Sequence, residues 1–142
     1  MAEPSSPRPP ASGLTVTVVT PEQTVVETTA SQVVLPLFDG EVGILRGHAP
    51  MIGRLGFGEM RLTVDGETDS YYVDGGFVQV ADNAVNVMTN RSMEIGEIDF
   101  VSADEALKKA IGLAAPGDEA LSARQKSIDQ ARAQLRLARR TQ

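Results

Sequence analysis

The stretch that decides the fold is Met60-Arg61-Leu62-Thr63-Val64-Asp65-Gly66. Apolar and polar side chains alternate over its first five residues, as they do in a strand with one buried face. Asp65-Gly66 then favours a two-residue hairpin turn, because glycine accepts the positive φ that such turns need. The run Ser70–Val73 supplies the returning strand. This segment therefore predicts a β-hairpin.

The same texture extends on both sides of the hairpin. Leu14–Val18 and Val33–Leu35 alternate in the same way, and Asp74-Gly75-Gly76 and Asp82-Asn83 mark further corners. Roughly eight to ten short strands at this spacing are typical of a sandwich or barrel and not of a parallel sheet with crossover helices. We predict an antiparallel β-sandwich, or flattened barrel, over residues 14–100.

The periodicity changes to a helical one at Ser102, and the fold class is therefore mainly β plus α. Ser102 followed by Glu105 has the form of a capping box, which predicts a helix start there. Pro116-Gly117 is expected to end this helix and Asp118 to cap a second one. The predicted apolar stripes are Ala103, Ala106, Leu107, Ala110 and Ile111 in the first helix, and Leu121, Ile128, Ala131, Leu135 and Ala138 in the second.

So short a break between helices predicts an antiparallel two-helix hairpin over residues 101–142. Its alanine-rich stripes bury little apolar area, and this burial stabilises the hairpin by on the order of a few kcal/mol in total. We therefore expect a weakly held hairpin that is able to open.

The charge is distributed unevenly along the chain. From Arg124 to the end there are six basic residues and one acidic residue, a net +5, so the preceding 123 residues carry −11 of the total of −6. A basic end on an acidic protein indicates an acidic partner, a nucleic acid, an anionic lipid surface or simply a solvated helix face. The acidic body would repel nucleic acid, and the small residues opposite the basic face suit a membrane surface poorly. A protein partner with an acidic patch fits best, and we expect no nucleic-acid partner.

The remaining composition excludes several kinds of site and segment. No cysteine is present, so disulfides and thiolate metal sites are excluded. No apolar run is long enough to cross a bilayer. Residues 1–13 are rich in proline, serine and alanine and lack the apolar stretch of a signal peptide, so we interpret them as a flexible tail.

We find no constellation that indicates catalysis. His48 is the single histidine, and no cysteine, nucleophile motif or converging acidic cluster accompanies it. The glycines at 53, 56 and 58 precede no Lys-Ser or Lys-Thr pair and open no helix, so they do not form a phosphate-binding loop. The sequence predicts a non-catalytic protein without a metal or cofactor.

One run, DGEVGILRGHAP at residues 39–50, closely resembles a hallmark of the epsilon subunits of bacterial and chloroplast rotary ATP synthases, which are equivalent to the mitochondrial delta subunits. Further segments resemble the same family in the same order: Leu14–Pro21, Gly58–Arg61, Tyr72–Val80 and Ala131–Arg136. Together they extend over nearly everything from Leu14 onward.

The resemblance implies a central-stalk subunit that couples rotation of the c-subunit ring to the catalytic head. In this family the sandwich clamps onto the foot of the gamma subunit and rests on the ring. The residues that match the docking segment here are Glu41, Gly43, His48 and Pro50. Glu41, an acid flanked by glycines, matches the ring-facing contact, and His48 matches a position at the gamma contact.

The resemblance also implies that the hairpin regulates the enzyme. Folded against the sandwich it permits rotation, and extended along gamma it restrains ATP hydrolysis. Its basic stripe would then face acidic loops on the catalytic beta subunits, which form the head together with the alpha subunits. The residues of that stripe are Arg132, Arg136, Arg139 and Arg140.

Some family members bind ATP through an Ile/Leu-Asp-x-x-Arg-Ala motif and further basic residues. The matching stretch is Ile98–Ala103, in which Ser102 replaces the arginine and so removes a fork of phosphate donors. The residues that remain at matching positions are Asp99, Lys109, Arg132 and Arg136. We expect ATP to be at most a weak regulatory ligand.

Two other functions are consistent with parts of the sequence. An independent β-sandwich binding module with a basic helical tail would fit the architecture but leave the run at residues 39–50 unexplained. A jelly-roll enzyme would need a metal or catalytic constellation, which the single histidine argues against. The family resemblance further implies a peripheral position at the cytoplasmic face of a bacterial inner membrane, with membrane association only through the complex.

Overall fold

Two tight turns fix the register of the strands around them. Asp65 and Gly66 have left-handed backbone angles, with φ of 51° and 79°. Two consecutive left-handed residues give a turn whose twist matches that of the flanking strands. Strand β6 (Phe57–Val64) therefore pairs in antiparallel register with β7 (Glu67–Asp74). The same geometry recurs at Asp82-Asn83, so both predicted hairpins are confirmed.

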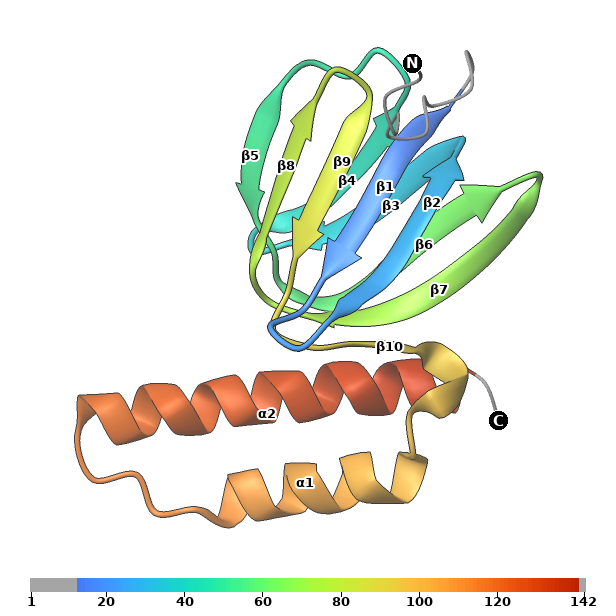
Figure 1. Ribbon diagram of the computed structural model, residues 1–142. Coiled ribbons are helices and arrows are strands. Elements are labelled where there is room, and N and C mark those ends of the chain that lie inside the picture. Colours follow the sequence, from blue (N-terminus) through green and yellow to red (C-terminus); the bar gives the residue numbers. More distant parts are fainter. Residues whose placement is uncertain (1–12, 141–142) are drawn as a thin grey trace.

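The computed structural model describes residues 13–140, so the predicted tail lies outside the described residues except for Gly13. The described chain forms two layers of strands followed by two long helices (Figure 1). The remaining elements are β1 (Leu14–Val19), β2 (Thr24–Ala30), β3 (Gln32–Leu37), β4 (Gly40–Leu45), β5 (Met51–Arg54), β8 (Phe77–Ala81), β9 (Ala84–Met88), β10 (Ser92–Glu94), the 3-10 helix η1 (Ile95–Glu97), α1 (Phe100–Gly112) and α2 (Asp118–Arg139).

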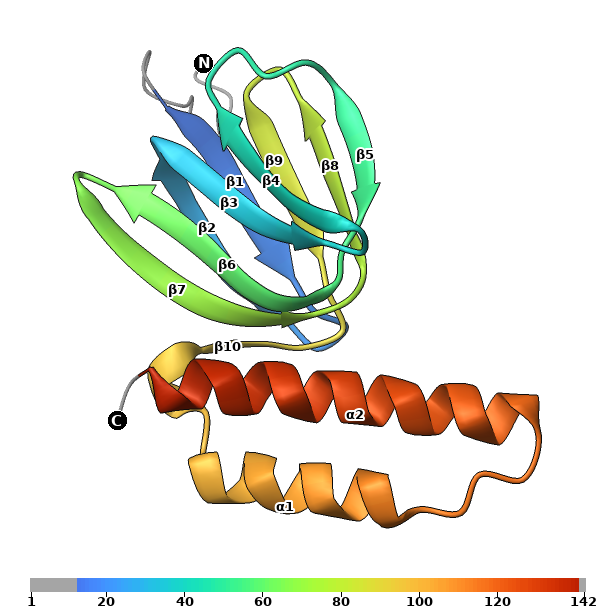
Figure 2. The same cartoon turned by 180° about the vertical axis from the view of Figure 1, so that it is seen from behind.

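The strands form two five-stranded sheets, in the orders β2-β1-β9-β8-β5 and β10-β7-β6-β3-β4. The sheets face each other as the two layers of a sandwich and do not close into a barrel (Figure 2). Strands β1 and β9 run parallel, so the prediction of an entirely antiparallel sandwich is wrong at this one pair. The alternating pattern of a strand indicates which face is buried but carries no information on the direction of its neighbour.

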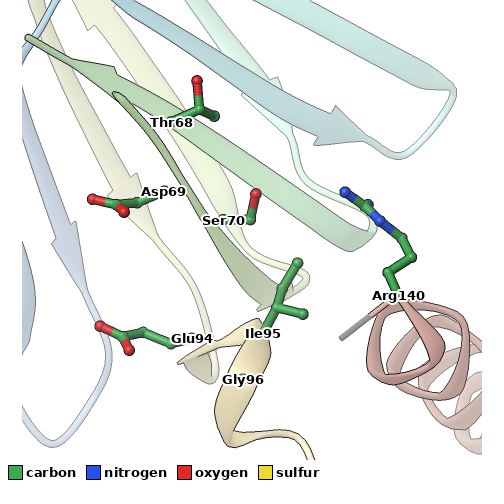
Figure 3. Close-up of a pocket in the computed structure, with 7 residues that line it drawn as sticks. All are labelled: Thr68, Asp69, Ser70, Glu94, Ile95, Gly96 and Arg140. Atoms are coloured by element: carbon green, nitrogen blue, oxygen red, sulfur yellow. The ribbon is translucent and has the colours of Figure 1, made fainter. Parts of the chain in front are cut away.

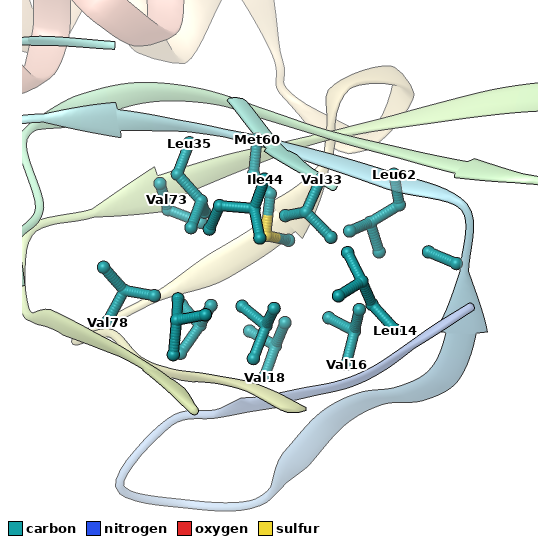
Figure 4. Close-up of a cluster of buried hydrophobic side chains, with 14 of the residues drawn as sticks. Leu14, Val16, Val18, Val33, Leu35, Ile44, Met60, Leu62, Val73 and Val78 are labelled. Carbon is teal, nitrogen blue, oxygen red and sulfur yellow. The ribbon is translucent and has the colours of Figure 1, made fainter. Parts of the chain in front are cut away.

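The core fills the space between the sheets with aliphatic side chains. Every second residue of β1, namely Leu14, Val16 and Val18, is fully buried, as its alternation predicts. Val33 and Leu35 meet them from β3 in the opposite sheet (Figure 4). The scarcity of aromatic residues is thus compensated by close packing of valine, leucine and isoleucine.

The first helix begins earlier than the capping-box pattern predicts. Its N-cap is Asp99, whose Oδ1 accepts a hydrogen bond from the Val101 amide at 3.2 Å. Ser102, predicted as the N-cap, lies inside the helix and donates its hydroxyl to Asp99 Oδ2 at 2.6 Å. The prediction is wrong because Asp99 is an equally good capping residue and lies closer to the preceding strand.

The connection between the helices also differs from the prediction. Helix α1 ends at Gly112, before Pro116-Gly117, and Gly117 is the N-cap of α2, with Asp118 as its first helical residue. Asp118 favours the helix through its charge near the N-terminus and not as a cap. Arg124 of α2 donates to the Ile111 carbonyl at 2.8 Å, so a side chain from the second helix satisfies the end of the first.

The predicted stripes are only partly buried. In α2 all of them except Leu121 are buried, whereas in α1 only Ala103 and Ala110 are. Leu121 and Ile111 are about half exposed and lie near the loop that joins the two helices. Helix α2 has a second buried face, which the sequence pattern did not indicate.

Candidate functional site

The second buried face of α2 docks the hairpin onto one end of the sandwich. In both views α2 lies between the sandwich and α1 (Figures 1 and 2). Its contact is a small apolar cluster made of Tyr72, Ile95, Ile98, Ala133, Leu137 and Ala138. The hairpin is therefore held by the sandwich as well as by the pairing of its two helices.

Two polar contacts flank this cluster along α2. Gln130 donates its Nε2 to Asp74 Oδ1 at 2.7 Å. About ten residues further along the helix, Arg140 Nη1 pairs with Glu59 Oε1 at 2.8 Å. Both acids are nearly buried, with side chains 8% and 9% exposed, so each needs its partner. Together the two contacts fix the position of α2 along its axis.

The Glu59 carboxylate has a second cationic partner in its own strand. Arg61 donates Nη1 to Glu59 at 2.9 Å and reaches Glu41 with Nη2 at 3.4 Å. Burial acts to raise the pKa of Glu59, but hydrogen bonds from Arg140, Arg61 and Ser70 outweigh it and hold the pKa below its ordinary value. The hydrogen bond to Glu59 in turn raises the pKa of Arg140. Glu59 therefore stays ionised in the docked state.

Arg140 lies between two shallow cavities. One, of about 360 Å³, is lined by Thr68, Asp69, Ser70, Glu94, Ile95, Gly96 and Arg140 (Figure 3). There Arg140 reaches from the end of α2 towards the sheet, while Asp69 and Glu94 point away from it. The described residues hold no group of acids, histidines or cysteines suited to a metal ion.

The predicted basic stripe is not one surface in this structure. Arg140 is paired with Glu59, and Arg139 lies over the Phe100 ring with its guanidinium carbon 5.8 Å from the ring centroid. Arg132 and Arg136 are exposed. Only the last two are available to an outside partner without breaking a contact of the docked hairpin.

The residues predicted to bind ATP are divided between two places. A cavity of about 540 Å³ between the helices and β10 is lined by Asp99, Ser102 and Lys109, together with Arg91. Arg132 is not among its lining residues, and Arg136 lines a different cavity beside Glu41. The Asp99 carboxylate is occupied in capping α1, and the Ser102 hydrogen bond to it holds its pKa below the ordinary value. The docked hairpin therefore gathers two of the four predicted residues.

The predicted docking residues lie along β4 and the loop after it. Glu41 is at the start of β4, near the docked end of α2, with which it shares a cavity. Gly43 faces open space, and His48 Nδ1 lies 2.7 Å from the Ala49 carbonyl oxygen in the loop that leads to Pro50. This loop is at the opposite end of the strand (Figure 1). Glu41 and His48 thus lie in two separate places on the sandwich, not one.

Exposed apolar side chains gather on the sheet formed by β5, β8 and β9. Ile52 is 76% exposed, Phe77 54% and Met88 49%. Phe77 is cross-strand partner to Met88 and pairs with Arg54, which lies over the exposed ring of Phe38. These side chains form an apolar patch on an otherwise acidic protein, and such a patch suits a protein-binding surface.

Comparison with known proteins decides the family. Residues 13–95, more than half of the chain, match the sequence profile of the family described as "ATP synthase, Delta/Epsilon chain, beta-sandwich domain". The ATP synthase epsilon chain of Rhodopirellula baltica is 43% identical over 122 residues, which cover 86% of this chain and 95% of that one. The epsilon chain of a Synechococcus species is 36% identical, over 84% and 88% of the two chains.

The chain belongs to the ATP synthase delta/epsilon family. Solved structures share its fold: a chain of the Euglena gracilis mitochondrial ATP synthase matches with a TM-score of 0.77 and 20% identity, over 92% of this chain and 84% of that one. A chain of the Tetrahymena thermophila central stalk and c-ring matches with a TM-score of 0.71 and 14% identity, over 88% and 96%. The predicted family and fold are confirmed, and membership makes the chain a non-catalytic ATP synthase subunit.

Several residues that position α2 on the sandwich were not predicted from the sequence. Glu59, Asp74 and Gln130 carry the polar contacts that position α2, and each forms them with a residue far away in the chain. No local pattern distinguishes them from solvated surface residues. The nearest signal was that Glu59 and Asp74 lie in segments predicted to form strands, where apolar and polar residues alternate. An acid in such a segment places a charge at the edge of a buried face.

Proposed function

We propose that this delta/epsilon chain is the central-stalk subunit that couples rotation of the c-subunit ring to the catalytic head and restrains ATP hydrolysis through its helical hairpin. The single observation that carries the proposal is the docking of α2 by a small cluster and two polar contacts, on a sandwich that is complete without it. Such a hairpin can leave the sandwich without unfolding it.

The sandwich has the surfaces that a coupling role needs. The apolar patch with Ile52, Phe77 and Met88 suits the gamma subunit, because burial of exposed apolar side chains stabilises a protein–protein contact. Glu41, whose side chain is 55% exposed, suits polar or basic loops of the c ring. Two contact points on one rigid body allow torque to pass between gamma and the ring.

The hairpin supports regulation through the residues that docking leaves free. Arg132 and Arg136 are exposed on α2 and suit acidic loops of the alpha and beta subunits. Arg139 and Arg140 join them only after their contacts with Phe100 and Glu59 are broken. Full engagement of the head therefore requires the hairpin to undock.

The membrane association that we propose is indirect. No helix within residues 13–140 is long and apolar enough to cross a bilayer. The position we infer is peripheral, at the cytoplasmic face of a bacterial inner membrane, with gamma and the c ring as the anchors.

The test is ATP hydrolysis by the assembled enzyme with the full chain and with a chain that ends at Ile98. We expect faster hydrolysis without the helices and unchanged assembly. A second comparison uses Arg132→Ala combined with Arg136→Ala, two residues that form no ion pair within the described residues of the docked chain, and hydrolysis should rise again. If neither change raises hydrolysis, the hairpin does not restrain the enzyme.

We also propose that ATP binds this chain weakly at most. The cavity with Lys109 and Arg91 offers cations for phosphate groups, but Ser102 stands where the family motif has arginine and Arg132 lies elsewhere. Titration of the full chain with ATP should show no saturation below about millimolar concentration, which corresponds to ~4 kcal/mol of binding free energy. Clear saturation at micromolar ATP would contradict this.

A further inference from the structure

One continuous chain of charges joins three elements of the molecule. Glu41 of β4 contacts Arg61 of β6 at 3.4 Å, and Arg61 contacts Glu59 of the same strand at 2.9 Å. Glu59 contacts Arg140, at the end of α2, at 2.8 Å. The start of β4, which carries Glu41, and the docked end of the hairpin are thus connected through two side chains.

Three of these four groups line one cavity of about 360 Å³. Its lining includes Glu41 and Glu59, and also Arg136, Leu137 and Arg140 from α2. With Arg61, the cluster contains three guanidinium groups and two carboxylates, so it has one positive charge in excess. Glu41 is the more exposed of the two acids, with its side chain 55% exposed against 9% for Glu59.

We propose that a basic group of a partner that engages Glu41 weakens the docking of α2, and that docking of α2 weakens this engagement in return. The inference rests on the proposed function, in which Glu41 at the start of β4 meets the c ring. It adds that this contact regulates the hairpin.

The sign of the effect follows from the charges. A cation that pairs with Glu41 raises the excess of the cluster from one positive charge to two. Arg61, released from Glu41, then competes more fully with Arg140 for Glu59. Both changes raise the free energy of keeping Arg136 and Arg140 next to the sandwich. Because binding free energies are linked, the docked hairpin lowers the affinity of Glu41 for a cation by the same factor.

The test uses the full chain alone and reads the opening of the last two turns of α2 by native-state hydrogen exchange. Exchange measures rare openings, so it works even when nearly all molecules are docked. Glu41→Gln removes one negative charge, and Glu41→Lys places a cation there. For exposed pairs we expect about a two- to fivefold increase in opening for Glu41→Gln, and about the square of that factor for Glu41→Lys.

The matched controls are Glu67→Gln and Glu67→Lys, which make the same charge changes at an exposed position of β7 that does not line the cavity of the cluster. They should leave the opening of α2 within twofold of the unaltered chain. Arg140→Gln should increase opening at least about tenfold, because it leaves the nearly buried Glu59 short of a charged partner. Salt should reduce the effect of Glu41→Lys, since exposed charges are screened.

A double variant tests the route. In an Arg61→Gln background, Glu41→Gln should have a smaller effect than in the unaltered chain, because the shared partner is gone. Equal effects of the Glu41 and Glu67 substitutions, or slower opening in Glu41→Lys, would overturn the inference. This experiment contains no assembled ATP synthase, so a negative result would not contradict the proposed restraint of hydrolysis. A negative result in the hydrolysis experiment would likewise not contradict the coupling between Glu41 and the docking of α2.

Discussion

Replacing Leu137 by alanine should release the hairpin from the sandwich without unfolding the sandwich. Leu137 is 2% exposed and is the only large side chain that α2 contributes to the docking cluster, since Ala133 and Ala138 are its companions there. Removing a buried leucine side chain costs about 2–5 kcal/mol. The contact lies at the edge of the sandwich and can partly collapse, so we expect about 2 kcal/mol.

This magnitude corresponds to about a thirtyfold change in the ratio of docked to undocked hairpin. Native-state hydrogen exchange should therefore speed up about thirtyfold for the amides of the last turns of α2. The amides of β8 and β9, in the sheet remote from the helices, should change by less than about twofold. Leu121→Ala is the control: it makes the same substitution in the same helix at a side chain that is 51% exposed. It should cost less than about 0.5 kcal/mol.

Two results would refute this reasoning. If Leu137→Ala destabilised β8 and β9 as much as α2, helix and sandwich would form one cooperative unit and the hairpin could not act as a separate switch. If exchange in α2 did not change, the two polar contacts, and not the apolar cluster, would supply the docking free energy.

Three further outcomes follow from single residues. Gly76 has φ of 104°, and a Cβ there would collide with a backbone carbonyl oxygen. Gly76→Ala should therefore lower the free energy of unfolding, measured in urea, by more than about 3 kcal/mol. Gly43→Ala, at a position that faces open space, should leave it unchanged. Burial raises the pKa of Tyr72 to about 12, so docking should weaken as pH rises from about 10 to 12. A tyrosinate absorbance titration of a Tyr71→Phe chain measures this, and truncation of the helices should move the pKa back towards 10. Because the pKa of Glu59 lies below its ordinary value of 4.5, its contribution to docking is complete above that pH and is lost as pH falls through the lowered pKa, which exchange of α2 amides against pH will show.

The parts of the fold that the sequence predicted are those that neighbouring residues determine. Asp65-Gly66 forms its turn from its own backbone preferences, and Leu14–Val18 shows its buried face by alternation alone. The parallel pairing of β1 with β9 depends on which strand arrives beside β1, and alternation is the same for either direction. The start of α1 was misplaced because Asp99 and Ser102 are both capping residues, and only the packing of the preceding segment decides between them.

The site was predictable to a smaller degree for the same reason. Arg139 and Arg140 are neighbours in the sequence and appeared as part of one basic stripe, yet one lies on Phe100 and the other on Glu59. Consecutive helical residues point about 100° apart, so two arginines in a row do not share a face. Basic residues that are close in the sequence form one surface only if the docking of the helix leaves their side chains on the same exposed face.

The double use of Arg140 that we propose changes how the regulatory role must be measured. Docked, Arg140 stabilises the hairpin on the sandwich through Glu59; undocked, it would be free for an acidic surface of the head. Arg140→Ala therefore weakens both states, and its net effect on ATP hydrolysis has no fixed sign. Arg132→Ala and Arg136→Ala weaken the head contact with little loss from the docked state, so they should raise hydrolysis, whereas Glu59→Gln weakens only the docked state and should lower it. Opposite signs for these two changes are what a hairpin exchanging between two binding surfaces requires, and equal signs would rule that exchange out.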